Sequence, residues 1–137
     1  MLNATTLRTA STAAITNLVE GWYGGQGLPG NYNKDFIPPG WTNSATERDL
    51  YSKVIKVSCR SCHVSRNKNL SFSAFTNLSA FTKQLKLDAV LCGDSRTMPN
   101  ALRTFNIFWS SRCGPVDQPC LLKANPDLEL TCPSCLP

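Results

Sequence analysis

The chain has 137 residues, of which 42% are hydrophobic and 17% are charged, and it carries a net charge of +5. This length and apolar content suit one folded domain and exclude an intrinsically disordered chain. Lysine and arginine form no run, so we expect no nucleic-acid partner. The sequence contains no run of about 18 apolar residues, so no transmembrane segment is predicted. The N-terminal residues also lack the apolar core of a secretory signal, so we expect the sequence to be a mature or truncated form.

Apolar residues at helical spacing predict a first helix over residues 5–22, with Asn3 as a candidate cap. They are Leu7, Ala14, Leu18 and Trp22. Glycines end this helix, and the sequence then becomes rich in Gly, Pro, Asn and aromatic residues as far as Trp41. Such a loop of about 20 residues is longer than most connections. We therefore expect an ordered functional loop that packs on the rest of the domain.

A second helix is predicted from Ser44 to Cys59. Ser44 is followed three residues later by Glu47, which is the pattern of a capping box. The apolar residues that then recur at helical spacing are Leu50, Val54 and Val57. This helix therefore leads directly into Cys59.

Two further helices and an irregular tail complete the predicted order. The third helix is expected over residues 72–91, with Gly93 as its stop. Its apolar stripe is Phe72, Phe75, Leu78, Phe81 and Leu85. The fourth is expected after Asn100 and carries Leu102, Phe105, Phe108 and Trp109. Beyond Arg112 the chain is rich in Pro and Cys and has little periodicity, so it is predicted to be irregular and covalently tied down. No segment alternates with a period of two, so the fold class is predicted to be mostly α.

The residues Cys59, Cys62 and His63 form the pattern C-x-x-C-H, which is typical of covalent haem attachment. Two thiols can add across the two vinyl groups of a haem, and the next residue then places an imidazole where it can ligate the iron. His63 is the only histidine in the chain, and it follows one of only two C-x-x-C pairs. The other pair, Cys132 and Cys135, is followed by Leu136. The pattern therefore predicts one covalent haem c.

Two other interpretations of this segment remain open. Cys59 and Cys62 could form a structural disulfide. They could instead supply half of a zinc site, with Cys92 or the C-terminal cysteines completing four ligands.

Met98 is the predicted sixth ligand of the iron. A second histidine is absent, and Met1 stands at the start of the sequence, which leaves the thioether of Met98 in the segment 96–100. Pro99 stiffens the backbone beside it. A thioether favours ferrous iron and raises the reduction potential. The alternatives are a core-filling methionine with five-coordinate iron, or a Lys, Asn or Tyr ligand.

The order of the predicted elements resembles that of a class I c-type cytochrome. A helix leads into C-x-x-C-H, further helices follow, and a Met-Pro loop precedes a closing helix. The resemblance covers residues 44–111. It implies thioether bonds at Cys59 and Cys62, a proximal His63, a distal Met98, and single-electron transfer between redox protein partners. The chain departs from a minimal cytochrome in two segments, an N-terminal arm over residues 1–43 and a disulfide-tied tail over residues 112–137. The implied location is the periplasm or the cell surface, and the basic charge suggests an acidic patch on the partner.

Other residues carry weaker predictions. The loop aromatics could cover a haem edge or simply pack the arm: Trp22, Tyr23, Tyr32, Phe36 and Trp41. Phe105 and Trp109 are expected in the core. Three arginines are candidates to pair with haem propionates, with simple solvation as the alternative: Arg60, Arg96 and Arg103. Five cysteines remain for at most two disulfides: Cys92, Cys113, Cys120, Cys132 and Cys135.

As an electron-transfer protein, the chain is not expected to be an enzyme. Two other functions are alternatives. A peroxidase-like haem enzyme would keep five-coordinate iron beneath a general acid or base, but no distal histidine is available. A cell-surface binding or structural module that carries a haem domain would account for the arm and the tail.

Overall fold

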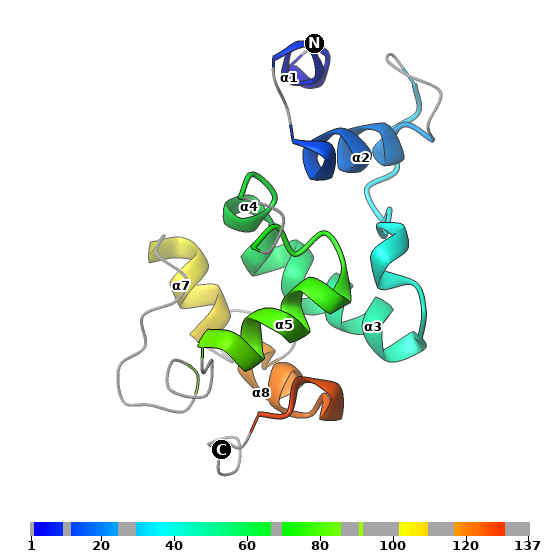
Figure 1. Ribbon diagram of the computed structural model, residues 1–137. Helices are drawn as coiled ribbons and strands as arrows, with labels where there is room; N and C mark the ends of the chain where they lie inside the picture. The colour runs from blue at the N-terminus through cyan, green and yellow to red at the C-terminus, as the bar shows by residue number, and fades with distance from the viewer. Residues whose placement is uncertain are drawn as a thin grey trace.

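The computed structural model describes residues 2–9, 12–24, 30–66, 70–85, 91, 102–109 and 117–130. Helices dominate these ranges and no strand occurs in them, which confirms the mostly-α prediction (Figure 1). Within the same ranges, no helix combines the length and the apolar character that crossing a membrane requires.

Three helical segments follow one another without a break and form the central helix of the domain. They are α3 (Ala45–Leu50), the π-helix η2 (Tyr51–Cys59) and α4 (Arg60–His63). The predicted N-cap is confirmed, because the Ser44 hydroxyl accepts a hydrogen bond of 3.0 Å from the Glu47 amide. The π-helix closes its turns one residue later than an α-helix does. Val57 therefore falls on the exposed side with 50% of its surface accessible, although the sequence pattern placed it on the apolar stripe.

The N-terminal arm contains two helices, so the prediction of one helix over residues 5–22 is wrong. They are α1 (Leu2–Arg8) and α2 (Ala13–Trp22), which pack against each other. The break occurs because Thr12 is extended and its hydroxyl accepts from the Ile15 amide, which makes Thr12 the N-cap of α2. Asn3 is not a cap: it lies within α1, and its side chain donates to the Tyr23 hydroxyl.

The third predicted helix is shorter at its start than the sequence pattern indicated. It is α5 (Phe75–Leu85), and Phe72 lies outside it in a left-handed conformation with a φ of 45°. The Phe72 carbonyl accepts a 3.0 Å hydrogen bond from the indole nitrogen of Trp41, which ends the 3-10 helix η1 (Pro39–Trp41). Phe72 is nevertheless buried, so its place in the core was predicted correctly. Leu91 is helical and buried, whereas Gly93 lies outside the described residues.

The tail contains regular structure, which corrects the prediction that it is irregular. After α7 (Leu102–Trp109), the chain forms α8 (Gln118–Lys123) and the 3-10 helix η3 (Pro126–Leu128). The Asp117 carboxylate caps α8 by accepting from the Cys120 amide at 3.0 Å. Cys120 is disulfide-bonded.

The core gathers around η2. Tyr51, Val54 and Ile55 are at most 1% exposed, and α7 and α8 both pack against this segment. Trp41 is fully buried beside Tyr51. Helix α5 packs on η1 and η3, and the buried residues of these elements belong to one apolar cluster.

Helix α7 contributes one face to this interior. Phe108 is buried and Trp109 packs against the core, as predicted for Trp109, while Phe105 is only half-buried. Leu102 is 76% exposed, although it belongs to the apolar positions of this helix in the sequence.

Candidate functional site

The C-x-x-C-H segment lies at the end of the central helix. Cys59 ends η2, and Cys62 and His63 lie in the single turn of α4. Residues three apart in a helix share a face, so Cys59 and Cys62 project from the same side. Both thiols are free, Cys59 is half-buried and Cys62 is exposed. The helix that was predicted to lead into Cys59 thus carries the whole motif.

The His63 ring is fixed by a main-chain hydrogen bond. Its Nδ1 lies 2.8 Å from the carbonyl oxygen of Leu70. A carbonyl oxygen only accepts, so Nδ1 carries the hydrogen and Nε2 of the neutral ring keeps its lone pair. Burial lowers the pKa of His63, and Arg66 lowers it further against the opposing effect of the Leu70 bond. The side chain is therefore a neutral imidazole whose Nε2 is the available ligand atom.

Two phenylalanines hold the imidazole from its face and its edge. Phe72 stacks on His63 with ring centroids 3.9 Å apart and planes 7° from parallel. Phe81 meets the same ring edge-on at 6.0 Å, and it also contacts Phe72 at 5.2 Å. Neither phenylalanine was a site residue in the sequence analysis, where both were expected only as members of an apolar stripe.

The chemistry of Cys59 argues against a reactive dithiol. Burial raises the pKa of its thiol to about 12, and the nearby Cys62 raises it as well. A redox-active C-x-x-C motif has the opposite property, because its attacking cysteine has a lowered pKa and is a thiolate at neutral pH. Cys59 instead remains a protonated thiol.

The donor set also does not form a zinc site within the part of the chain that the structure describes. No three His, Cys, Asp or Glu side chains converge there in a way that could hold a metal ion. Cys59, Cys62 and His63 are among these side chains, and zinc needs four converging ligands.

Several predicted residues lie outside the described ranges: Met98, Arg96, Cys92, Cys113, Cys132 and Cys135. Arg103, a candidate for a haem propionate, is exposed on α7.

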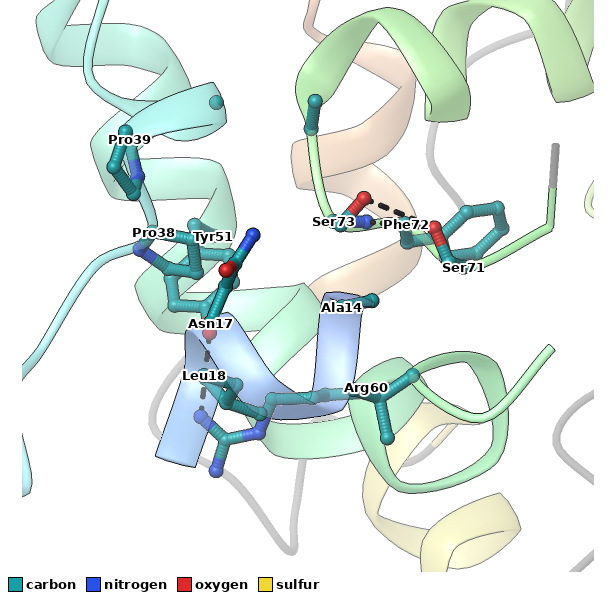
Figure 2. Close-up of a pocket in the computed structure, with 13 residues that line it drawn as sticks. Ala14, Asn17, Leu18, Pro38, Pro39, Tyr51, Arg60, Ser71, Phe72 and Ser73 are labelled. Carbon is teal, nitrogen blue, oxygen red and sulfur yellow. Dashed lines mark hydrogen bonds between the residues drawn. The ribbon is translucent and has the colours of Figure 1, made fainter. Parts of the chain in front are cut away.

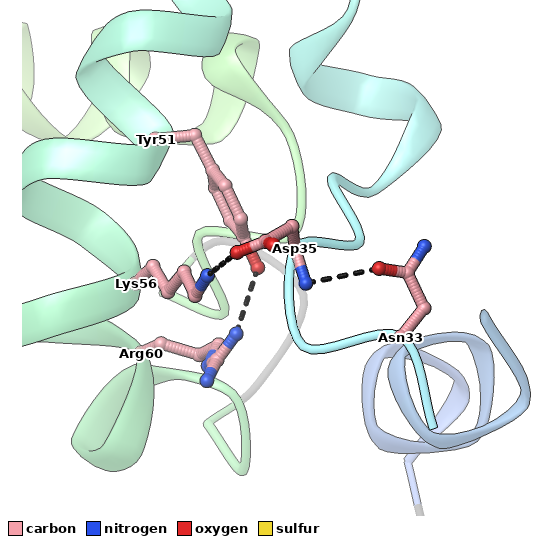
Figure 3. Close-up of polar contacts among 5 residues, drawn as sticks. All are labelled: Asn33, Asp35, Tyr51, Lys56 and Arg60. Carbon is pink, nitrogen blue, oxygen red and sulfur yellow. Dashed lines mark hydrogen bonds and ion pairs between the residues drawn. The ribbon is translucent and has the colours of Figure 1, made fainter. Parts of the chain in front are cut away.

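Arg60, within the motif, contacts the arm. Its Nη1 donates to the Tyr51 hydroxyl at 3.3 Å, and its guanidinium carbon lies 5.3 Å from the centre of the Trp22 ring. One helical turn earlier, Lys56 pairs with Asp35 at 3.2 Å (Figure 3). The arm is therefore attached to the helix that carries the motif.

The loop aromatics pack the arm and the core. Trp22 contacts Tyr32 edge-on at 5.8 Å. The ring of Phe36 lies against Gly21, so a Cβ at residue 21 would require the Phe36 ring to move. Trp41 is buried in the core. These contacts correspond to the packing interpretation of the five aromatics.

Comparison with known proteins found no matching protein-family model, curated protein or solved structure.

Proposed function

We propose that this chain is a c-type cytochrome domain that transfers single electrons through one haem c. In this proposal Cys59 and Cys62 form the thioether bonds and His63 is the proximal ligand. The observation that carries the proposal is the hydrogen bond from His63 Nδ1 to the Leu70 carbonyl. Histidines that ligate metals almost always donate their other ring N–H to an acceptor of this kind.

The residues of the motif fit a covalent haem. The two thiols are free and lie on one face of the last helical turns. The free thiols, and the absence of converging metal donors among the described residues, favour attachment to a cofactor over a structural disulfide or a zinc site. The only histidine of the chain directly follows the second thiol.

Each side chain of the site has a definable task. When bound, the haem supplies the one-electron couple. The Leu70 carbonyl sets the tautomer of His63, and burial of the ring lowers its pKa, so that a proton does not compete for Nε2 at neutral pH. Phe72 and Phe81 limit rotation of the ring and exclude water from its face and edge.

The proposal extends to Met98 as the distal ligand and to a cytochrome c-like arrangement of the helices around the haem. A neutral thioether would raise the reduction potential, as expected for a carrier that exchanges electrons with protein partners. The surplus cysteines suit an oxidising compartment, so we place the protein in the periplasm or at the cell surface.

Haem attachment tests this proposal through matched cysteine pairs. The full chain is expressed in a strain competent for cytochrome c maturation, and its intact mass is measured after denaturation. We expect one covalent haem on the wild-type chain and none on the Cys59→Ser/Cys62→Ser variant. The control variant Cys132→Ser/Cys135→Ser removes the other C-x-x-C pair and should keep the haem. A wild-type mass equal to that of the bare polypeptide would refute the proposal.

A further inference from the structure

A cavity of about 220 Å³ lies between the arm and the central helix (Figure 2). Its apolar walls include Leu18 of α2, Pro38 and Phe72. Polar side chains also line it, among them Asn17 and Arg60. The cavity thus combines an apolar interior with one cation, which is the usual composition of a small-molecule site.

Arg60 is a cation that lines this cavity, and no carboxylate of the described residues neutralises its charge. A guanidinium has five N–H donors. One of them bonds to the Tyr51 hydroxyl, and the group lies over the Trp22 ring. Among the residues that the structure describes, no carboxylate forms an ion pair with Arg60. A half-buried guanidinium without a counter-ion favours an anionic ligand, above all a carboxylate that can accept two parallel hydrogen bonds.

The volume of the cavity limits the size of this ligand. An engineered apolar cavity of about 150 Å³ is large enough to bind benzene, whereas sites for drug-sized ligands occupy about 300–1,000 Å³. A cavity of about 220 Å³ lies between these values and accommodates one six-membered ring with a small substituent.

We propose that this cavity binds a small aromatic monocarboxylate, with the carboxylate on Arg60 and the ring against Leu18 and Phe72. This goes beyond electron transfer. Phe72 also stacks on His63, so a ligand against Phe72 lies one side chain away from the motif histidine. The arm contributes one wall of the site through α2, which gives residues 13–22 a role besides packing.

Three probes with the same ring and different charge test the proposal on the unmodified full chain. Benzoate, benzyl alcohol and benzylamine are titrated into the protein by isothermal calorimetry. We expect saturable one-to-one binding of benzoate, at least about tenfold tighter than that of benzyl alcohol because of the charge-assisted hydrogen bonds, and no binding of benzylamine. Absence of saturable benzoate binding, or equal binding of the three probes, would overturn the proposal.

Three variants locate the binding site. Arg60→Gln should weaken benzoate binding by about tenfold or more. Ala14→Leu adds volume at a residue that lines the cavity, so it should abolish benzoate binding. Arg103→Gln changes an exposed arginine on α7 and should leave binding unchanged. Unchanged binding by the first two variants would assign benzoate to another place and contradict the proposal. Calorimetry does not read haem absorption, so its result and the haem-attachment result are separable.

Discussion

The Nδ1 atom of His63 donates a 2.8 Å hydrogen bond to the carbonyl oxygen of Leu70, seven residues later in the chain. This bond determines which nitrogen of the only histidine is free to act as a ligand. The free nitrogen, Nε2, belongs to a ring that two phenylalanines hold and that burial keeps neutral. These properties together motivate the assignment of His63 as a proximal haem ligand.

Replacing Met98 should change the coordination of the iron and leave the covalent attachment intact. In Met98→Ala we expect a high-spin ferric haem that binds cyanide readily, because the variant lacks a sixth ligand. Met98→His is the matched control: it should remain low-spin, with a lower reduction potential than the wild type, because imidazole replaces the thioether that favours ferrous iron. Absorption spectra and redox titration provide the measurement. A low-spin spectrum in Met98→Ala identical to that of the wild type would contradict the assignment of this ligand.

A buried hydrogen bond connects the tail to the helix turn that precedes Cys59. The Ser58 hydroxyl donates to Gln118 Oε1 at 2.5 Å, and the two residues are 1% and 3% exposed. Gln118→Ala leaves the Ser58 hydroxyl buried without this acceptor, so we expect the free energy of unfolding to fall by about 1–3 kcal/mol. Urea denaturation monitored by circular dichroism measures the change.

Two controls separate this bond from general effects of substitution. Ser58→Ala/Gln118→Leu removes both polar partners and should lose less stability than Gln118→Ala does. Asn43→Ala removes an exposed bond to Glu47 and should change stability by less than about 0.5 kcal/mol. A Gln118→Ala variant as stable as Asn43→Ala would show that the tail is not anchored at Ser58.

Helix α7 offers a comparison of two apolar residues whose burial differs strongly. Phe108 is 3% exposed and Leu102 is 76% exposed. Phe108→Ala should cost about 3–5 kcal/mol because it opens a cavity in the core, whereas Leu102→Ala should cost less than about 0.5 kcal/mol. Thermal and urea unfolding of the two variants provide the test. Similar losses for both would mean that α7 packs through a different face.

The free-thiol form of the chain, expressed without haem attachment, should lose stability in alkaline solution through Cys59. Folding raises the pKa of this thiol from 9.0 to about 12. Between these values the unfolded chain releases the Cys59 proton and the folded chain keeps it, so the free energy of unfolding falls as the pH rises. The contribution of the protonated Cys59 thiol to the free energy of unfolding is fully present below pH 9.0 and is lost as the pH approaches 12.

Urea midpoints at a series of pH values, compared with those of Cys59→Ser, isolate this effect from the titration of other groups. The difference between the two proteins should change above pH 9.0 and stay constant below it. A constant difference over the whole range would contradict the burial of this thiol.

Much of the helical fold could be predicted because local signals agree with tertiary packing. The Ser44 cap and the helix that leads to Cys59 follow from the capping pattern and from apolar spacing. The break at Thr12 was missed because a threonine that caps α2 was read as an interior helical residue. In the tail, Asp117 and Pro119 are ordinary signals of a helix start, but the abundance of proline and cysteine obscured them.

The sequence alone was enough to name the side chains of the candidate site, but not their surroundings. Cys59, Cys62 and His63 lie within five consecutive residues and are chemically distinctive, so the sequence identifies them as candidates directly. The Leu70 carbonyl could not be predicted, because every residue has a carbonyl and only the chain path decides which one meets the imidazole. Phe72 was expected in a helix; its left-handed φ of 45° places it outside α5, where its ring stacks on His63.

The most direct test of the account is a pyridine haemochrome spectrum of the purified full chain, reduced and oxidised, after extraction with acidified acetone. We predict a haem that stays with the polypeptide and gives the reduced spectrum of a haem with two thioether bonds, at one haem per chain. A colourless polypeptide after extraction, or the spectrum of a haem whose vinyl groups are intact, would contradict the central claim that Cys59, Cys62 and His63 form a c-type haem site.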